Sequence, residues 1–212
     1  MSQTFGKTRW KRFAVVMVPT IAATAAVGIS IAQGALAASF SISGIPATVT
    51  AGSLDGTGFA QYGTVDVTQN GTPVPVAVSG FKTATINNMC QSVPIDTHTP
   101  LGTYTLTIKA GGAGSDPVSA SGIFLDMTEL QAKTAEFDGI NIGVAGGGIT
   151  KGPVNPQDAG KVDPNGFSQE ADSAHLKGVE QQSLATSAGT FVLNGMHLTI
   201  TAGDHPCTIP SP

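Results

Sequence analysis

The chain has 212 residues, of which 41% are hydrophobic and only 11% are charged, and it contains 27 glycines and 13 prolines. An ordinary soluble domain has about 25% charged residues, so the low charge is the feature that needs an explanation. The hydrophobic content excludes a disordered tail, and the glycines lack the strict three-residue period of a collagen-like fibre. The chain is therefore long and apolar enough to form one real core.

The N-terminus has the pattern of an export signal. Four basic residues and no acidic residue lie within the first twelve positions, an uncharged run spans residues 13–31, and small residues follow up to Ala37 and Ala38. This order predicts a secretory signal peptide over residues 1–38, exported by the Sec route to the cell envelope or the exterior. The apolar run also approaches the roughly 20 residues that cross a bilayer, so a membrane anchor at residues 13–33 is the alternative.

Removal of the predicted leader changes the charge balance. Residues 39–212 contain six lysines, no arginine and fourteen acidic residues, which gives a net charge of −8. Such a domain cannot offer the basic stripe that a phosphate backbone requires, which excludes nucleic acid as a partner. A membrane is a partner through the N-terminal hydrophobic segment if that segment is not cleaved.

Cys90 and Cys207 are the only cysteines of the chain. Two cysteines in an oxidising exterior most often pair, so we expect a disulfide that ties the C-terminal tail to the middle of the domain. A nucleophilic cysteine is the alternative, and it would need a histidine and a carboxylate brought near it by the fold.

From residue 39 onward, apolar residues alternate with hydroxyl side chains, as in the run from Thr103 to Ile108. This period of two predicts a single, mainly β domain over residues 39–212, with layered sheets that form a sandwich or an irregular β-helix, after the N-terminal hydrophobic helix. The pair Asn70-Gly71 predicts a two-residue hairpin turn. Pro73 and Pro75 in the next run predict an edge strand, because proline cannot donate to a ladder.

Other segments interrupt or modify this strand pattern. Residues 171–184 are the best candidate for a helix. A four-residue motif with glycine at its third position recurs, and at Gly195 it predicts a bulge that keeps Phe191 and Met196 on one face. Glycines and prolines break the pattern over about residues 144–169, which predicts a long loop that we expect to be mobile. The motif glycines are Gly44, Gly80, Gly122, Gly139, Gly178 and Gly195.

The histidines suggest no catalytic or metal site. The sequence lacks the Gly-x-Ser-x-Gly elbow of serine hydrolases. His197 alternates with apolar neighbours and is predicted to face solvent. His205 and Cys207 together would supply two ligands where structural zinc takes four. His98 and His175 lie in no recognisable motif.

Closely spaced carboxylates are predicted to lie on the solvent face of strands, since spacing alone cannot place two of them across a cleft. We therefore predict no catalytic, cofactor-binding or metal residues, and favour a protein that is not an enzyme. The pairs are Asp126 with Glu129, Glu136 with Asp138, and Glu170 with Asp172.

Four segments resemble a known family: residues 1–12, Asn87-Asn88-Met89-Cys90-Gln91-Ser92-Val93, Phe137-Asp138-Gly139-Ile140-Asn141-Ile142-Gly143 and Ser187-Ala188-Gly189-Thr190-Phe191. Together they resemble DUF6230, an uncharacterised actinobacterial family typical of Streptomyces, whose members often carry the label cholesterol esterase. The family has no established catalytic residue to carry over, and no motif in this chain supports the label. Residues 171–196 are also similar in rhythm to β-strand lipid-carrier folds of the envelope.

These observations predict an exported protein that acts as a non-enzymatic structural or lipid-associated surface component. A module that binds a lipid or sterol-like ligand between sheets is the first alternative. An esterase is the second, and it would require serine, histidine and aspartate gathered by the fold.

Overall fold

The computed structural model describes residues 42–98 and 102–209, and this part of the chain is mainly β, as predicted. The predicted signal peptide and N-terminal hydrophobic helix lie outside the described residues. Within the described ranges, no helix is long and apolar enough to cross a bilayer. The elements are β1 (Ala47–Val67), β2 (Pro73–Asn87), β3 (Met89–Asp96), β4 (Thr103–Ala110), β5 (Val118–Asp138), β6 (Asn141–Ala145), the short 3₁₀ turns η1 (Gly146–Gly148) and η2 (Pro156–Asp158), β7 (Phe167–Val192) and β8 (His197–Ala202).

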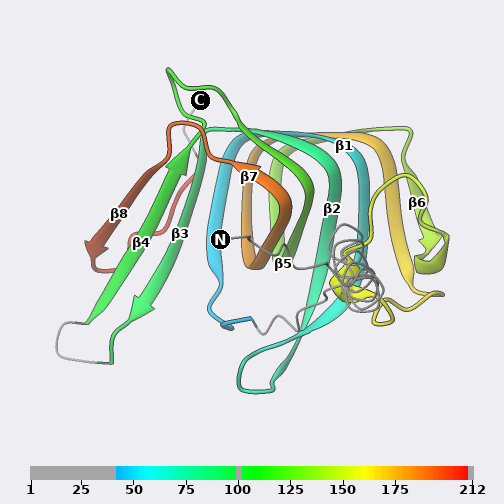
Figure 1. Ribbon diagram of the computed structural model, residues 1–212, viewed down its shortest axis with the longest axis horizontal. Coiled ribbons are helices and arrows are strands. Elements are labelled where there is room, and N and C mark those ends of the chain that lie inside the picture. The colour runs from blue at the N-terminus through cyan, green and yellow to red at the C-terminus, as the bar shows by residue number, and fades with distance from the viewer. Residues whose placement is uncertain (1–41, 99–101, 210–212) are drawn as a thin grey trace, which may run out of the picture. The chain divides into compact units, whose positions relative to one another are not determined.

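The four longest strands close into a ring. β1 pairs with β2, β2 with β5, β5 with β7 and β7 with β1, and every pairing is antiparallel. The sequence leaves a sandwich and an irregular β-helix open, whereas the structure has one eight-stranded sheet in the order β6-β7-β5-β2-β1-β3-β4-β8. This sheet curls strongly, so that the long strands wrap around an apolar interior (Figure 1).

Strands β3, β4 and β8 continue the sheet beyond β1 as a flatter extension, which we call the wing (Figure 1). One face of the wing carries hydroxyl side chains, and the C-terminal tail crosses this face. The Thr105 hydroxyl donates to the Gly203 carbonyl at 2.7 Å, and the Cys207 amide donates to the Ser92 hydroxyl at 2.8 Å. A disulfide joins Cys90 to Cys207, as the sequence predicts.

Glycines inside the long strands reset the side-chain alternation. Leu54 and Phe59 both lie in the ring core, although strict alternation would place them on opposite faces. Between them Gly58 has a φ of +61°, a conformation that residues with a side chain rarely adopt. Gly122 in β5 and Gly178 in β7, two glycines of the recurring motif, have the same left-handed conformation inside their strands.

At Gly195 the bulge prediction is wrong. Its φ of +63° belongs to a turn between β7 and β8, and these strands lie in different parts of the sheet. The helix considered for residues 171–184 is wrong as well, since the segment lies within β7. The kink at Gly178 explains the error, because it puts Leu176 and Val179, three residues apart, on the same buried face.

The hairpin predicted at Asn70-Gly71 is confirmed, with five residues rather than two between β1 and β2. Pro73 and Pro75 predict an edge strand, and this prediction is confirmed only for the N-terminal end of β2. Both prolines pair with β1, while pairing with β5 begins at Ala77. From Ala77 onward β2 is a central strand of the ring.

The predicted long loop lies between β6 and β7, at residues 146–166, and packs on the outer face of β1 and β2. Gly152 touches the β1 backbone so closely that a Cβ there would lie 2.3 Å from the Ala60 nitrogen. Ile149 and Val162 pack on a second small core that includes Tyr62 and Val78. The loop is therefore held against the sheet, in contrast to the mobile segment that its composition suggests.

We predict that the double variant Cys90→Ser/Cys207→Ser is less stable than the wild type by up to about 5 kcal/mol, because the disulfide closes a loop between residues 117 positions apart. Urea unfolding of the oxidised wild type and the variant measures this difference. Wild-type protein treated with a reductant should have the same urea midpoint of unfolding as the variant. An unchanged midpoint in both experiments would show that the tail is held by its hydrogen bonds alone.

Candidate functional site

The interior of the ring contains a cavity of about 260 Å³, to which all four long strands contribute. Its walls are mostly apolar, and an apolar cavity of about 150 Å³ is already large enough to hold benzene. The cavity therefore has room for a larger apolar group. Its lining residues are Leu54, Phe59, Gln61, Ser79, Phe81, Leu125, Met127, Leu130, Ala132, Ala135, Phe137, Gln169, Leu176, Val179 and Gln181.

Packing of rigid aromatic rings against small side chains leaves this volume unfilled. The ring of Phe59 lies 5.3 Å from that of Phe81 and 5.2 Å from that of Phe137, measured between centroids. On β5 the lining residues Ala132 and Ala135 end at a methyl group. Since protein interiors are normally close-packed, an unfilled volume of this size that extends into the core is a candidate binding site.

The second half of β5 provides the opening of the cavity. β5 pairs with both β2 and β7 as far as Met127, and beyond it with β7 alone. The lining residues Leu130 and Ala135 lie in this second half and are exposed, Leu130 by 37%. A ligand can therefore reach the interior beside this unpaired edge.

Four polar side chains interrupt the apolar lining. Ser79, Gln61 and Gln169 form a row across β2, β1 and β7. Within the row, Gln169 Nε2 donates to Gln61 Oε1 at 2.5 Å, and Gln61 Nε2 donates to the Ser79 hydroxyl at 2.9 Å. Gln181 lies further along β7 and is only 4% exposed. Its side-chain amide borders the cavity and has no hydrogen-bond partner in the described part of the chain.

A larger and more open groove of about 710 Å³ lies between the wing and the C-terminal tail. Thr199, Thr201, Lys109 and His205 are among its lining residues. Of these, Thr201, Lys109 and His205 are exposed, so water already solvates their polar groups. A ligand bound in this groove would remove little apolar surface from water. The ring cavity is therefore the stronger candidate for ligand binding.

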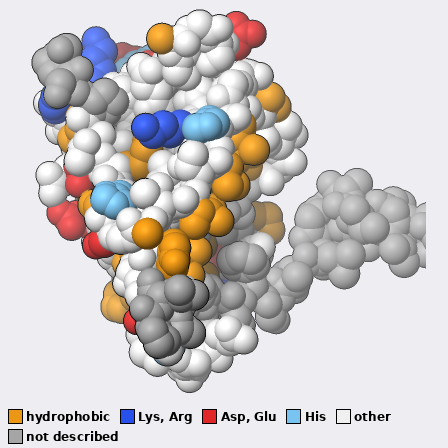
Figure 2. Space-filling model, turned by 90° about the vertical axis from the view of Figure 1, so that its left-hand side faces the viewer, with side chains coloured by type: hydrophobic (Ala, Val, Ile, Leu, Met, Phe, Trp, Pro, Cys, Tyr) orange, Lys and Arg blue, Asp and Glu red, His pale blue; other side chains and the backbone are white. Residues whose placement is uncertain are grey.

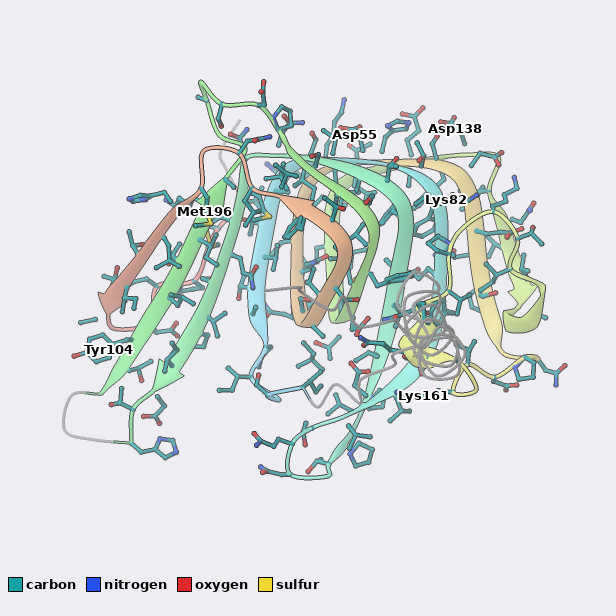
Figure 3. The ribbon with its side chains drawn as sticks, viewed as in Figure 1. Asp55, Lys82, Tyr104, Asp138, Lys161 and Met196 are labelled. Carbon is teal, nitrogen blue, oxygen red and sulfur yellow. A yellow bond between two sulfur atoms is a disulfide. The ribbon has the colours of Figure 1, made fainter. Side chains whose placement is uncertain are left out.

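His175 lies between two carboxylates on the outside of the ring. Its Nδ1 lies 2.9 Å from Asp55 Oδ1, and its Nε2 lies 3.5 Å from Asp138 Oδ2. The hydrogen bond with Asp55 raises the pKa of His175. Asp55 and Asp138 project from the top of the curved strands in Figure 3, on the opposite side of the sheet from the cavity lining. The Ser173 hydroxyl donates to Asp138 Oδ2 at 2.6 Å, so a carboxylate, rather than the imidazole, accepts its hydrogen bond.

The other histidines also lie apart from any nucleophile. His98 pairs with Asp96, His205 Nε2 contacts the Ala202 carbonyl, and His197 is exposed on β8 as expected. In the described ranges, no serine hydroxyl is hydrogen-bonded to a histidine, and no group of three or more His, Cys, Asp or Glu side chains could hold a metal ion.

Glu170 has a structural role that its position in the sequence did not reveal. It accepts hydrogen bonds from the backbone amides of Lys151 at 2.8 Å and Thr150 at 2.6 Å, and from Asn141 Nδ2 at 3.1 Å. These donors lower the pKa of Glu170. The solvent-face prediction is wrong for this residue, which is 3% exposed, because the long loop folds over it. Its neighbour Asp172 is exposed and pairs with Lys151.

The loop also covers a cluster of carboxylates on the outer face of the ring. Asp126 on β5 and Asp66 on β1 are 9% and 8% exposed, and Asp158 in the loop is buried. Burial raises the pKa of Asp126 to about 7, and the charges of Asp66 and Asp158 act in the same direction, while Lys161 opposes them. Lys161 lies at the lower edge of the loop in Figure 3. The solvent-face prediction is therefore wrong for Asp126 as well, although Glu129 is exposed.

Asp158 connects this cluster to the loop. The Tyr62 hydroxyl donates to Asp158 Oδ2 at 2.9 Å and accepts from the Asn155 amide at 2.9 Å. Burial raises the pKa of Tyr62. Asp126 Oδ1 and Asp66 Oδ2 have no partner in the described structure. The cluster is thus a buried acidic patch in which burial raises the pKa of Asp66 and Asp126, and no spacing pattern in the sequence pointed to it.

An apolar band covers the face of the wing opposite the C-terminal tail. Figure 2 shows hydrophobic side chains gathered along this side of the molecule. Aligned rows across the three strands include Ile95 with Tyr104, Leu106 with Ile200, and Ile108 with Leu198. Exposed apolar surface of this kind is typical of contact with another molecule or a lipid. The exposed members of the band are Ile95, Leu198 and Ile200.

We predict that the variant Asp126→Asn changes the pH dependence of stability. The folded-state pKa of about 7 lies above the unfolded value of about 3.9, so the folded wild type holds an extra proton between these pH values. The free energy of unfolding of the wild type should therefore fall by up to about 4 kcal/mol, relative to the variant, as the pH rises from 4 to 7. Urea titrations across this range, with Asp116→Asn at an exposed turn as a control for lost charge, measure the difference. Parallel curves for wild type and Asp126→Asn would contradict the prediction.

Comparison with known proteins identifies a family but no activity. The chain has no match among curated proteins and none among solved structures. A family model described as a family of unknown function, DUF6230, matches residues 43–208, which include every strand of the ring and the wing. Because this match covers most of the chain, the protein belongs to the DUF6230 family.

Proposed function

We propose that this protein is an exported, non-enzymatic component of the cell envelope or exterior that binds the acyl chain of a lipid, or a similar apolar group, inside the strand ring. The observation that carries the proposal is the cavity of about 260 Å³, lined by all four long strands and open beside β5. Transfer of an apolar chain from water into such a site is favourable by about 25 cal/mol for each Å² of apolar surface removed from water.

The size and shape of the cavity limit what it can hold. Ligand pockets for drug-sized molecules usually measure about 300–1,000 Å³, so this cavity lies just below that range. It suits one hydrocarbon chain or one small ring system better than a complete two-chain lipid. The exposed Leu130 and Ala135 at the opening would let the remainder of a larger molecule stay outside.

The geometry favours binding over ester hydrolysis. A serine esterase requires a base within hydrogen-bond reach of the nucleophile. Among the described residues, His98 and His175 contact carboxylates, and His205 contacts a backbone carbonyl group. His197 is exposed on β8, and Ser173 donates to Asp138. The lining of the cavity contains one serine, Ser79, and its hydroxyl accepts from Gln61. A retained ligand therefore fits these contacts better than a cleaved one.

Export is the part of the proposal that the sequence supports most. Residues 1–38 have the charge and hydropathy pattern of a secretory leader. The disulfide between Cys90 and Cys207 is compatible with an oxidising exterior, where such bonds persist. If the leader is retained, residues 13–33 would hold the domain at a membrane, close to a source of lipid.

We predict that filling the cavity abolishes lipid retention. The variant Ala132→Phe should block the cavity near its opening, since Ala132 lines it and packs against the ring core. Lipid extraction and native mass spectrometry of the full chain should show a bound apolar molecule in the wild type and at least tenfold less in the variant.

Ala202→Phe is the matched control, because Ala202 is exposed on β8 and lies outside the cavity lining. It should retain as much lipid as the wild type. Equal lipid in all three proteins, or none in the wild type after exposure to lipid vesicles, would contradict the proposed function.

A mass measurement tests export separately. For protein isolated from its native cells we expect a mass that lacks residues 1–37 or 1–38, together with the loss of two hydrogens to the disulfide. A retained N-terminus in a protein found with membranes would support the anchor alternative. A full-length protein with reduced cysteines in the cytoplasm would contradict export.

A further inference from the structure

We propose that the cavity selects a neutral amphiphile whose hydroxyl or carbonyl group forms a hydrogen bond with the side-chain amide of Gln181. This inference rests on the proposed function and adds the chemical class of the ligand. It concerns molecules such as long-chain alcohols, esters or amides, and it excludes long-chain carboxylates as the preferred ligands.

Gln181 carries the argument because it is a buried polar side chain without a partner. It is 96% buried, it lines the cavity, and its amide has no hydrogen-bond partner in the described structure. A smaller void of about 30 Å³ adjoins the same residue and shares Leu54, Leu125 and Val179 with the main cavity. In the described structure the amide is not among the fully enclosed polar atoms that lack a partner, so it borders the open volume of the cavity, where a ligand can reach it. An apolar chain that fills the cavity would deprive this amide of hydrogen bonds to water unless the ligand itself supplies a partner.

The other polar groups of the lining already have partners. Gln169 donates to Gln61, and Gln61 donates to Ser79, along one row of neighbouring strands. Within this row, the side chains of Gln169, Gln61 and Ser79 are hydrogen-bonded to one another. The amide of Gln181, in contrast, has both N–H donors and its oxygen acceptor available to a ligand. A hydroxyl can accept from or donate to this amide, and an ester or amide carbonyl can accept from it.

The absence of charge in the lining decides the type of head group. Among the described residues that line the cavity, none is ionisable. A carboxylate drawn in to reach Gln181 would lose its hydration without gaining a cation, and an unpaired buried charge is far more costly than a buried hydroxyl. The same reasoning excludes an ammonium group, which would meet no carboxylate there.

The test compares two probes of equal chain length on the full chain, 1-decanol and decanoate at pH 8, by equilibrium dialysis. We expect 1-decanol to bind at least tenfold more tightly than decanoate. The variant Gln181→Leu should weaken binding of 1-decanol about five- to tenfold, which corresponds to one neutral hydrogen bond. Its neighbour Gln182→Leu is the matched control, because Gln182 pairs with Thr48 and does not line the cavity. If the leucine variant does not fold, Gln181→Met replaces it.

The outcomes separate this inference from the proposed function. Because Ala132→Phe fills the cavity, any probe that this variant still binds is bound elsewhere, for example at the N-terminal apolar segment. If 1-decanol binding is lost in Ala132→Phe but unchanged in Gln181→Leu, the cavity binds ligands and the role of Gln181 is overturned. If decanoate binds as tightly as 1-decanol, the neutral-ligand class is overturned. If binding is absent, or unchanged in Ala132→Phe, the proposed function fails together with the inference.

Discussion

The pairing between β1 and β7 is the constraint on which the rest of the structure depends. It runs from Ala47 opposite Ser183 to Tyr62 opposite Ser168, and so joins segments more than 100 residues apart. Because β7 also pairs with β5, this contact turns a row of antiparallel strands into a closed ring. Closure gives every long strand an inner face and an outer face. The inner faces surround the apolar cavity, whereas part of the outer face is covered by the long loop.

On the inside, closure around strands rich in alanine leaves space. The phenylalanine rings pack against one another, while the small side chains of Ala132 and Ala135 on β5 leave the volume beside them unfilled. Unfilled apolar volume lowers stability, and the amide of Gln181 borders this volume without a hydrogen-bond partner among the described residues. A fold that keeps both within its core is consistent with a ligand that supplies the missing contacts.

On the outside, the ring has an apolar patch around Tyr62, Val78 and Phe124 that needs a cover. The long loop supplies it, and Glu170 fixes the start of the loop through two backbone amides. The covering has a cost, because Asp66 and Asp126 lose their contact with water. Burial of Asp126 beneath the loop raises its pKa. Protonation of Asp126 therefore stabilises the folded state, with the loop in place, as the pH falls.

The sequence by itself determined the mainly β class, the disulfide, the hairpin at Asn70-Gly71 and the position of the long loop, because each depends on local alternation, turn chemistry or cysteine count. The recurring glycine motif marked Gly122 and Gly178, but the bulge that it predicted at Gly195 is a turn. Only the tertiary structure decided that the sheet closes into a ring, that Gln181 faces its cavity, and that Asp126 and Glu170 lie beneath the loop. These features depend on which distant strands pair and in which register, and a period of two is the same for a sandwich, a solenoid or a ring.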